Sequence, residues 1–366
     1  MNKRNFGIDL LRCISMLFVV ILHTLGHGGV LRNVTSSSPN YYIAWLIEIS
    51  AYCAVNCYAL ISGFVGYKSN YKYSNIIFLW VQVFFYSTSI SIFFQIINPA
   101  SIGLKEILTS FLPVLKGDYW YFTSYFALFF LMPLFNKGIN ALSKSEAKTL
   151  VIATILIFCF IRVFLCFDTF QLFNTKDLFI TNSGYSVFWL SLLYIIGGCL
   201  GKSQILETFS TLKLILIYSL CIVFTCAFKF LIENISLNII REQINPAIFI
   251  EYISPTIVLS AIALLGLFSR LDFKSQKLIN IIKFFAPISF GVYLIHEHPM
   301  IKFSMIFDKF IFLANTPPLI FIISLIGIVM AIYISCSLID YARLLLFNTL
   351  KIKETITKLL KKFKKV

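Results

Sequence analysis

The sequence predicts an all-α fold: a polytopic membrane helix bundle with about ten transmembrane helices. The chain of 366 residues is 59% hydrophobic and only 13% charged, whereas soluble globular proteins carry roughly 25% charged residues. Apolar runs of about 20 residues, the length that crosses a bilayer as a helix, recur along the whole chain. Lysine and arginine gather in the short loops between these runs and in the C-terminal tail.

The predicted transmembrane helices cover residues 7–28, 42–67, 75–97, 119–136, 148–167, 185–201, 211–232, 247–268, 284–304 and 317–347. The fourth and sixth are short, and an earlier end of the ninth, near His298, is the alternative. The first run carries Arg12 and has no small-residue cleavage site, so we expect it to stay in the membrane rather than to be removed as a signal peptide. Residues 1–347 therefore form one membrane-embedded domain. Residues 348–366 form a basic amphipathic tail, which we expect to lie on an anionic inner leaflet.

The net charge of +15 does not indicate nucleic acid binding, because the basic residues lie in loops between apolar runs and in one tail. With the N-terminus in the cytoplasm, about 20 Lys and Arg residues fall inside and about 8 outside, in the sense of the positive-inside rule. We expect a multi-pass plasma-membrane protein with both termini in the cytoplasm, in contact with membrane lipids and not with nucleic acid.

The nine cysteines lie mostly inside apolar runs, and no CxxC pair or Cys/His spacing typical of a metal site occurs. His296 and His298 form a His-x-His pair, but two ligands are too few for a metal ion. The sequence therefore predicts neither a disulfide framework nor a metal site.

Arg12 and His23 are eleven positions apart in the first predicted helix. Eleven residues turn an α-helix by about 1100°, so both side chains share one face, within about 20°, and lie about 16 Å apart along the axis. Polar residues inside a spanning helix indicate a functional site. His23, nearer the outer side, is a candidate general base for a hydroxyl. The alternative is a buried histidine that only bonds a neighbouring helix.

Arg12 lies on the cytoplasmic side of the same helix, and a guanidinium suits bidentate recognition of phosphate. It is a candidate contact for the phosphates of a nucleotide-bearing donor. Asp9, one turn earlier, completes the candidate catalytic set of Asp9, Arg12 and His23. The alternative is an Asp9–Arg12 ion pair that only stabilises the helix end.

Six further residues are candidate donor or substrate contacts, each with a structural alternative. Ser62 lies in a small-residue segment that lines a path or only packs helices. Trp120 and Tyr121 form an aromatic wall for a sugar or an interfacial anchor. Arg162, inside a predicted span, binds an anionic lipid-linked substrate or pairs with Asp168. The remaining two are Tyr293 and His296 at the outer end of the ninth helix.

Several segments occur in order along residues 5–345: Ile8–Arg12 with His23, Ser62–Phe64, Trp120–Tyr121 followed by Met132–Pro133, Tyr194–Gly197 and Phe290–His296. Together they resemble the acyltransferase 3 family of integral membrane O-acyltransferases. The resemblance implies about ten helices and transfer of an acyl group, usually acetyl from acetyl-CoA, to a hydroxyl of an extracytoplasmic or lipid-linked glycan. It matches His23 to the family's essential histidine and Arg12 to its arginine. Acetyl-CoA is then a co-substrate, with no bound cofactor.

Two other classes of function compete with this one. A transporter or flippase for a lipid-linked oligosaccharide is expected to show an internal repeat and polar residues in several central helices. A glycan polymerase is expected to have a large outer loop, whereas every outer loop predicted here is short. Consumption of acetyl-CoA by membranes that contain the protein distinguishes an acyltransferase from both.

Overall fold

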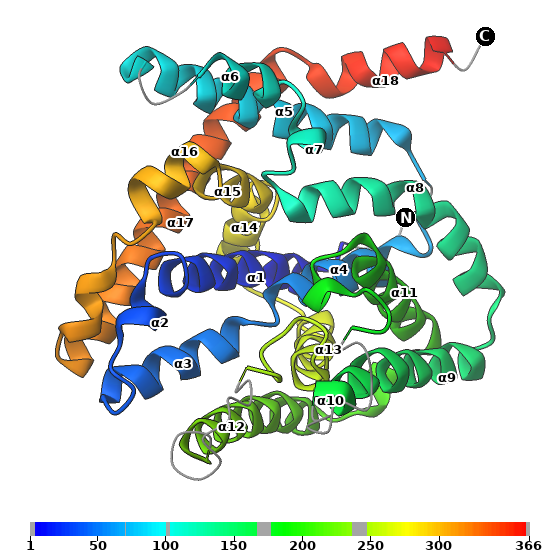
Figure 1. The fold of residues 1–366 in the computed structure, drawn as a ribbon. Helices are drawn as coiled ribbons and strands as arrows, with labels where there is room; N and C mark the ends of the chain where they lie inside the picture. Colours follow the sequence, from blue (N-terminus) through cyan, green and yellow to red (C-terminus); the bar gives the residue numbers. More distant parts are fainter. Residues whose placement is uncertain (1–3, 70, 100–102, 167–176, 236–246, 364–366) are drawn as a thin grey trace.

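The computed structural model describes residues 4–69, 71–99, 103–166, 177–235 and 247–363, and every regular element in these ranges is a helix. The prediction of an all-α membrane bundle is confirmed. Within the described residues, seven helical segments are long and apolar enough to cross a membrane, and two further apolar helices are shorter. Figure 1 shows their arrangement around a central first helix.

Helices occur at each of the ten predicted runs. They are α1 (Phe6–Leu25), α3 and α4 (Pro39–Ala51, Ala54–Gly66), α5 (Tyr73–Ile97), α8 (Trp120–Ala141), α9 and α10 (Lys144–Ile155, Ile161–Cys166), α11 (Val187–Ser203), α12 (Thr211–Ile235), α13 (Pro255–Ser269), α14 and α15 (Gln276–Phe285, Ser289–His296) and α17 (Pro318–Thr349). Short helices connect them or follow them: α2 (Val30–Asn33), α6 (Leu104–Ser110), α7 (Pro113–Lys116), α16 (Pro299–Ile301) and α18 (Ile352–Phe363).

Proline interrupts two of the predicted runs. The eighth run was expected to be helical from residue 247, but α13 begins at Pro255, after an extended Ser254. The ninth was expected to reach residue 304 or to end earlier, near His298, and the structure agrees with the earlier end: α15 ends at His296 and α16 begins at Pro299. Proline disfavours the helical conformation of the residue before it, so each X-Pro step interrupts the apolar run.

Helix α1 crosses the centre of the bundle and packs against α3, α4, α13, α14, α15 and α17 (Figure 1). Its first turn is capped by Asn5, whose side chain accepts a hydrogen bond from the Ile8 N–H at 3.1 Å. Such a cap satisfies one of the four free N–H groups at a helix start. Because α1 is surrounded on most sides, its polar residues Asp9, Ser15 and Thr24 are buried against protein.

The closest helix pair, α4 and α11, depends on two glycines. A Cβ atom at Gly63 would lie 1.9 Å from the Tyr194 carbonyl oxygen, and one at Gly197 would lie 2.1 Å from the Leu60 carbonyl oxygen. Small residues let membrane helices approach closely. Two of the segments singled out in the sequence, Ser62–Phe64 and Tyr194–Gly197, therefore meet as a packing interface.

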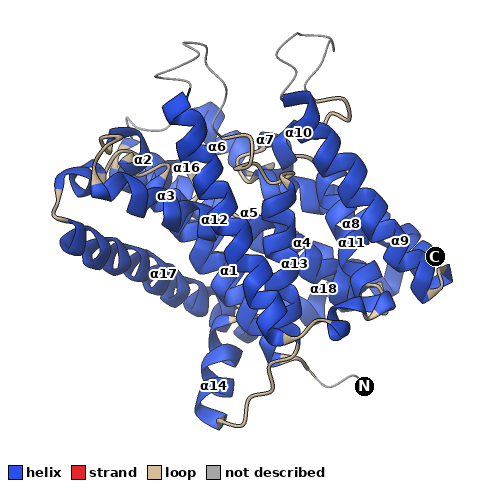
Figure 2. Ribbon diagram, turned by 90° about the horizontal axis from the view of Figure 1, so that it is seen from below, coloured by secondary structure: helices blue, strands red, loops and turns tan. Residues whose placement is uncertain are grey.

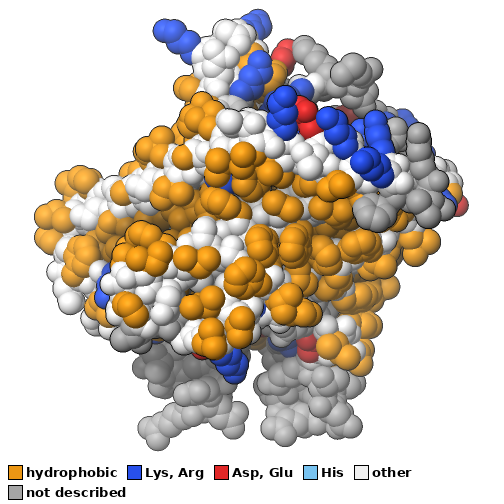
Figure 3. All heavy atoms as spheres, turned by 90° about the horizontal axis from the view of Figure 1, so that it is seen from above, with side chains coloured by type: hydrophobic (Ala, Val, Ile, Leu, Met, Phe, Trp, Pro, Cys, Tyr) orange, Lys and Arg blue, Asp and Glu red, His pale blue; other side chains and the backbone are white. Residues whose placement is uncertain are grey.

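Figure 2 shows the N-terminus and α14 at one end of the bundle and α2, α7 and α16 at the other. We name these the basic end and the α16 end. Hydrophobic side chains cover the middle of the molecule, and Lys and Arg gather at one end (Figure 3). The basic end includes α14 and α18, whose lysines are Lys277, Lys283, Lys353, Lys358, Lys361 and Lys362.

A buried ion pair within α17 is bonded by a tyrosine of α5 and packs against α15. Arg343 donates from Nη2 to Asp340 Oδ2 at 2.7 Å, and Tyr86 on α5 donates to Asp340 Oδ1 at 2.7 Å. Both charged side chains are almost fully buried. Asp340 lies directly against Gly291 of α15, where an added Cβ would be 2.0 Å from its carboxyl carbon.

Candidate active site

His23, in the last turn of α1, meets His296, the last residue of α15. Nδ1 of His23 lies 2.8 Å from Nε2 of His296, and the ring centroids are 5.0 Å apart. The Glu297 carboxylate also lies close, with its Oε2 3.1 Å from His23 Nδ1. Two consecutive residues, both far from His23 in sequence, thus converge on one of its nitrogens.

The hydrogen bonds of His296 decide which nitrogen of neutral His23 carries its proton. Nδ1 of His296 lies 2.6 Å from the Val292 carbonyl oxygen. A carbonyl only accepts, so His296 Nδ1 carries a hydrogen and its Nε2 is an acceptor. His23 Nδ1 must then donate to it. The proton of neutral His23 therefore lies on Nδ1, and Nε2 keeps a free lone pair that can take a proton.

Glu297 is held by a cation on its other oxygen. Lys302 Nζ forms an ion pair with Glu297 Oε1, while Oε2 faces His23. The carboxylate is 91% buried. A buried carboxylate beside an imidazole N–H orients the ring and stabilises the imidazolium that forms when the opposite nitrogen takes a proton.

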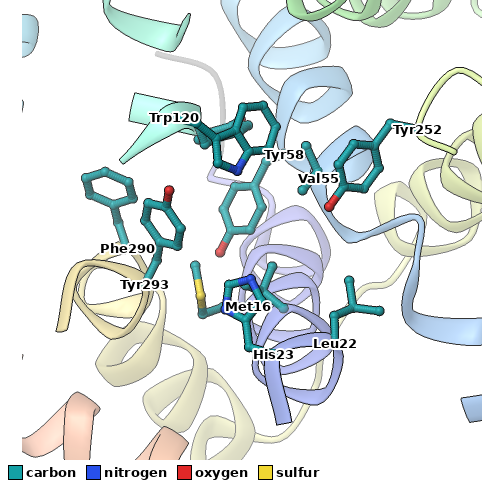
Figure 4. Close-up of a pocket in the computed structure, with 11 residues that line it drawn as sticks. Met16, Leu22, His23, Val55, Tyr58, Trp120, Tyr252, Phe290 and Tyr293 are labelled. Atoms are coloured by element: carbon teal, nitrogen blue, oxygen red, sulfur yellow. The ribbon is translucent and has the colours of Figure 1, made fainter. Parts of the chain in front are cut away.

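The cavity beside His23 is narrow and lined mainly by aromatic rings (Figure 4). The space open to water-sized molecules is about 40 Å³, enough for a few waters and too small for a sugar or a thioester arm. The rings come from four parts of the chain: Tyr58 on α4, Trp120 and Tyr121 on α8, Tyr252 before α13, and Phe290 and Tyr293 on α15.

Arg12 lies on the predicted face of α1. Met16 and Val19, which follow Arg12 at helical spacing, line the cavity together with His23. Arg12 itself does not line it: its Nη1 donates to Asp9 Oδ1 at 2.6 Å, and its side chain is 31% exposed. Tyr58 connects the cavity with the Arg12 turn of α1, because its ring lines the cavity and its hydroxyl donates to the Arg12 carbonyl oxygen at 2.8 Å.

Asp9 does not meet His23. It lies at the basic end of α1, fourteen residues before His23, which corresponds to about 21 Å of helix. Its carboxylate accepts from Arg4 Nε at 2.5 Å as well as from Arg12. The structure therefore shows Asp9 as the partner of two arginines.

The model of a family described as an acyltransferase domain matches residues 5–337. The chain belongs to this acyltransferase 3 family. Comparison with curated proteins and with solved structures found no significant match. The match spans α1 and the helices that bring His23, His296 and the aromatic cavity together.

Two predicted contacts of this acyltransferase lie outside the cavity. Ser62 donates to the Tyr58 carbonyl oxygen within α4. Arg162 pairs with Glu251 at 3.2 Å; Asp168, its expected partner, lies outside the described residues. The cavity does include three of the predicted contacts, Trp120, Tyr121 and Tyr293, and His296 bonds His23.

Three residues of this site were not predicted from the sequence: Glu297, Tyr58 and Tyr252. Glu297 could have been predicted, because it directly follows His296, which was a candidate residue. Tyr58 and Tyr252 had no signal, since a tyrosine in an apolar run is ordinary for a membrane helix. Only the fold brings them to His23.

The other histidine of the His-x-His pair is structural. His298 Nδ1 accepts from the Met300 N–H at 3.2 Å and caps α16, while its Nε2 lies 3.3 Å from the Ser87 carbonyl oxygen. Burial lowers the pKa of His298 to about 4, against the opposing effect of the Ser87 carbonyl. His298 is therefore neutral and serves to end α15 and start α16.

Proposed function

We propose that this acyltransferase moves an acetyl group from acetyl-CoA to a hydroxyl of an extracytoplasmic or lipid-linked glycan, with His23 as the general base. The observation that carries the proposal is the arrangement of His23. Its Nδ1 donates to His296 beside the Glu297 carboxylate, no group in the described part of the chain bonds its Nε2, and the side chain lines an aromatic cavity.

The donor is proposed to approach from the basic end, which we place in the cytoplasm of a plasma-membrane protein with both termini inside. Lys and Arg predominate there (Figure 3), in the sense of the positive-inside rule. Arg12 is the guanidinium nearest to the cavity on α1, about 16 Å along the axis from His23. Its role is to hold a phosphate of acetyl-CoA while the thioester arm extends along Met16 and Val19 toward His23.

The proposed chemical step is a direct transfer. His23 Nε2 takes the proton of a sugar hydroxyl as the hydroxyl oxygen attacks the thioester carbonyl carbon. The tetrahedral intermediate collapses, the C–S bond breaks, and the resulting imidazolium returns the proton to the CoA sulfur. Glu297 stabilises the imidazolium between these events. The products are the acetyl ester and free CoA, and no oxidant, reductant or metal ion is consumed.

The acceptor is proposed to bind among the aromatic rings at the α16 end. Trp120 and Tyr252 lie nearly parallel, with centroids 6.1 Å apart and planes 23° apart, and both line the cavity. Flat rings offer apolar faces to the C–H groups of a sugar, and Tyr hydroxyls offer hydrogen bonds. This surface suits a glycan better than an ion or an extended apolar chain.

The test is His23→Ala in cells, with the acetyl content of the surface glycan measured by NMR. We expect a fall of about 10²–10⁴-fold, the usual contribution of a general base. His298→Asn is the matched control, since it removes a buried histidine but keeps a good helix cap. Unchanged acetylation by His23→Ala at normal protein level would exclude His23 as the base.

The same preparation separates acyl transfer from the rival functions. Membranes with wild-type protein are expected to consume acetyl-CoA and release CoA in the presence of acceptor. A flippase or a polymerase would show no such consumption. Transfer of the acetyl group to water alone would indicate that the acceptor assignment is wrong while the donor assignment holds.

A further inference from the structure

Three potential metal ligands converge at the α16 end of α1. The ligand atoms of His23, His27 and Glu297 all lie within 4.8 Å of one another. Glu297 Oε2 is 3.1 Å from His23 Nδ1 and 3.8 Å from His27 Nε2. A tetrahedral zinc ion with bonds of about 2.0–2.2 Å separates its ligands by roughly 3.4 Å. Two of the three separations are therefore already close to that value.

A second observation also indicates a ligand at this place. Glu297 Oε2 is a buried oxygen that accepts no hydrogen bond within the described part of the chain, because the Nδ1 hydrogen of His23 goes to His296, while Lys302 holds the other oxygen of the same carboxylate. Buried polar atoms nearly always have a partner. The free oxygen faces two imidazoles, and this donor set of nitrogen and oxygen is one that zinc prefers.

The helix positions suit metal binding as well. His23 and His27 are four residues apart, so they lie on one face of the chain as it leaves α1, with ring centroids 4.7 Å apart. The His27 side chain is 36% exposed, which gives an ion access from the α16 end. His296 Nε2, 2.8 Å from His23 Nδ1, is a further nitrogen beside the cluster.

We propose that His23, His27 and Glu297 bind a divalent transition-metal ion such as Zn²⁺ and that this ion inhibits acyl transfer. On binding, the proton leaves His23 Nδ1 and Nε2 takes up a proton from solvent, so the side chain stays neutral and Nδ1 becomes a ligand. The ion then replaces the hydrogen bond to His296 and occupies the position from which Glu297 supports His23. The sequence prediction of no metal site considered the cysteines and the pair His296 and His298, whereas the fold assembles a different set.

Inhibition rests on the proposed function, since it needs His23 as the base. With the ion on Nδ1, the single proton of neutral His23 lies on Nε2, so Nε2 has no lone pair left to accept a proton. The Glu297 carboxylate is also neutralised by the ion. Both effects remove the base that a sugar hydroxyl requires.

The positive charge of Lys302 opposes the binding of a cation at this site. Removing that charge should therefore tighten metal binding, which is a test with a defined direction. Lys302 places a cation on the same carboxylate, whereas Arg32 is paired with Asp308. Replacing the ammonium of Lys302 by an uncharged group removes repulsion and frees the second carboxylate oxygen. Lys302→Met is therefore expected to bind Zn²⁺ at least about tenfold more tightly than the wild type.

Binding is tested on the purified full-length protein in detergent, with Zn²⁺ content and affinity measured directly and Co²⁺ used as a spectroscopic probe. We expect one ion per chain and tetrahedral Co²⁺ absorption bands. His27→Gln should weaken Zn²⁺ binding by at least about 100-fold, since even outer-shell changes cost 10–100-fold. His298→Asn should bind like the wild type. Equal Zn²⁺ affinity in His27→Gln and wild type would overturn the site.

Activity is measured separately, with Zn²⁺ titrated into membranes that carry each variant. Wild-type transfer should fall as the site fills, while His27→Gln should stay active at the same Zn²⁺ concentration. Saturated binding with undiminished wild-type transfer would overturn inhibition and leave the binding result standing. Zinc binding by a protein that transfers no acetyl group would instead contradict the proposed function and support the metal site.

Discussion

His296 presents its Nε2 to His23 Nδ1 at 2.8 Å because its own Nδ1 is tied to the Val292 carbonyl one turn earlier in α15. The backbone of α15 thereby decides the tautomer of a side chain on α1. This arrangement differs from a histidine–carboxylate pair alone, because the neutral imidazole of His296 also orients His23. His296 and Glu297 act on the same nitrogen and are expected to differ in what they contribute.

Glu297→Gln is expected to lower the rate of transfer by about 10²-fold or more, approaching the loss of the base itself. The amide keeps the size of the side chain but cannot stabilise an imidazolium by charge. The measurement is kcat for acetyl transfer in membranes. His296→Gln is the comparison: its amide oxygen can still accept from His23 Nδ1, so it should retain more activity. Equal rates for Glu297→Gln and wild type would contradict a role for the carboxylate.

Arg12→Ala is expected to raise KM for acetyl-CoA more than it lowers kcat, because a phosphate contact contributes binding energy far from the reacting atoms. A charge-assisted bond is worth about 1.5–3 kcal/mol, or roughly 10–100-fold in KM. Arg4→Ala removes the other arginine bound to Asp9 and serves as the control. If both variants lose only stability and to the same extent, the Asp9 pairing is the sole role of Arg12.

Trp120→Ala is expected to raise KM for the acceptor by about 3–10-fold, corresponding to the 0.5–1.5 kcal/mol of an aromatic contact. KM for acetyl-CoA should not change. Trp120→Phe, which keeps a flat ring beside Tyr252, should recover most of the affinity. A matched rise in KM for both substrates would instead indicate that Trp120 supports the helices around the cavity.

Gly63→Ala is expected to lower the unfolding temperature in detergent and the yield of folded protein. The new methyl would collide with the Tyr194 carbonyl, and overpacking of this kind costs about 1–3 kcal/mol. The control is Gly327→Ala in α17, where an added Cβ meets no atom within 4 Å. That change should leave stability unchanged or raise it by about 0.5–1 kcal/mol. Identical unfolding temperatures for the two variants would contradict the close contact of α4 and α11.

The helices were predictable because a segment that crosses lipid must be a long apolar run. The interruptions of these runs were harder to predict. Pro255 and Pro299 lie inside or beside apolar runs, and a hydropathy window averages over them. Within the candidate site, helical periodicity alone placed Arg12 and His23 on one face. It carried no information about partners from other helices. The contact between His23 and His296 was not predicted, and the approach of Tyr58 and Tyr252 depends on helix packing that no local pattern describes.

The contact between Gly291 and Asp340 changes how the late motif Phe290–His296 is to be understood. Gly291 leaves room for the carboxyl group of Asp340. Asp340 lies on α17, a helix that carries neither His23 nor His296. A relative with a larger residue at position 291 would have to lose the acid at 340, and then Arg343 would be left as an uncompensated charge. The three positions are therefore expected to vary as a set during evolution, independently of which acceptor a given member modifies.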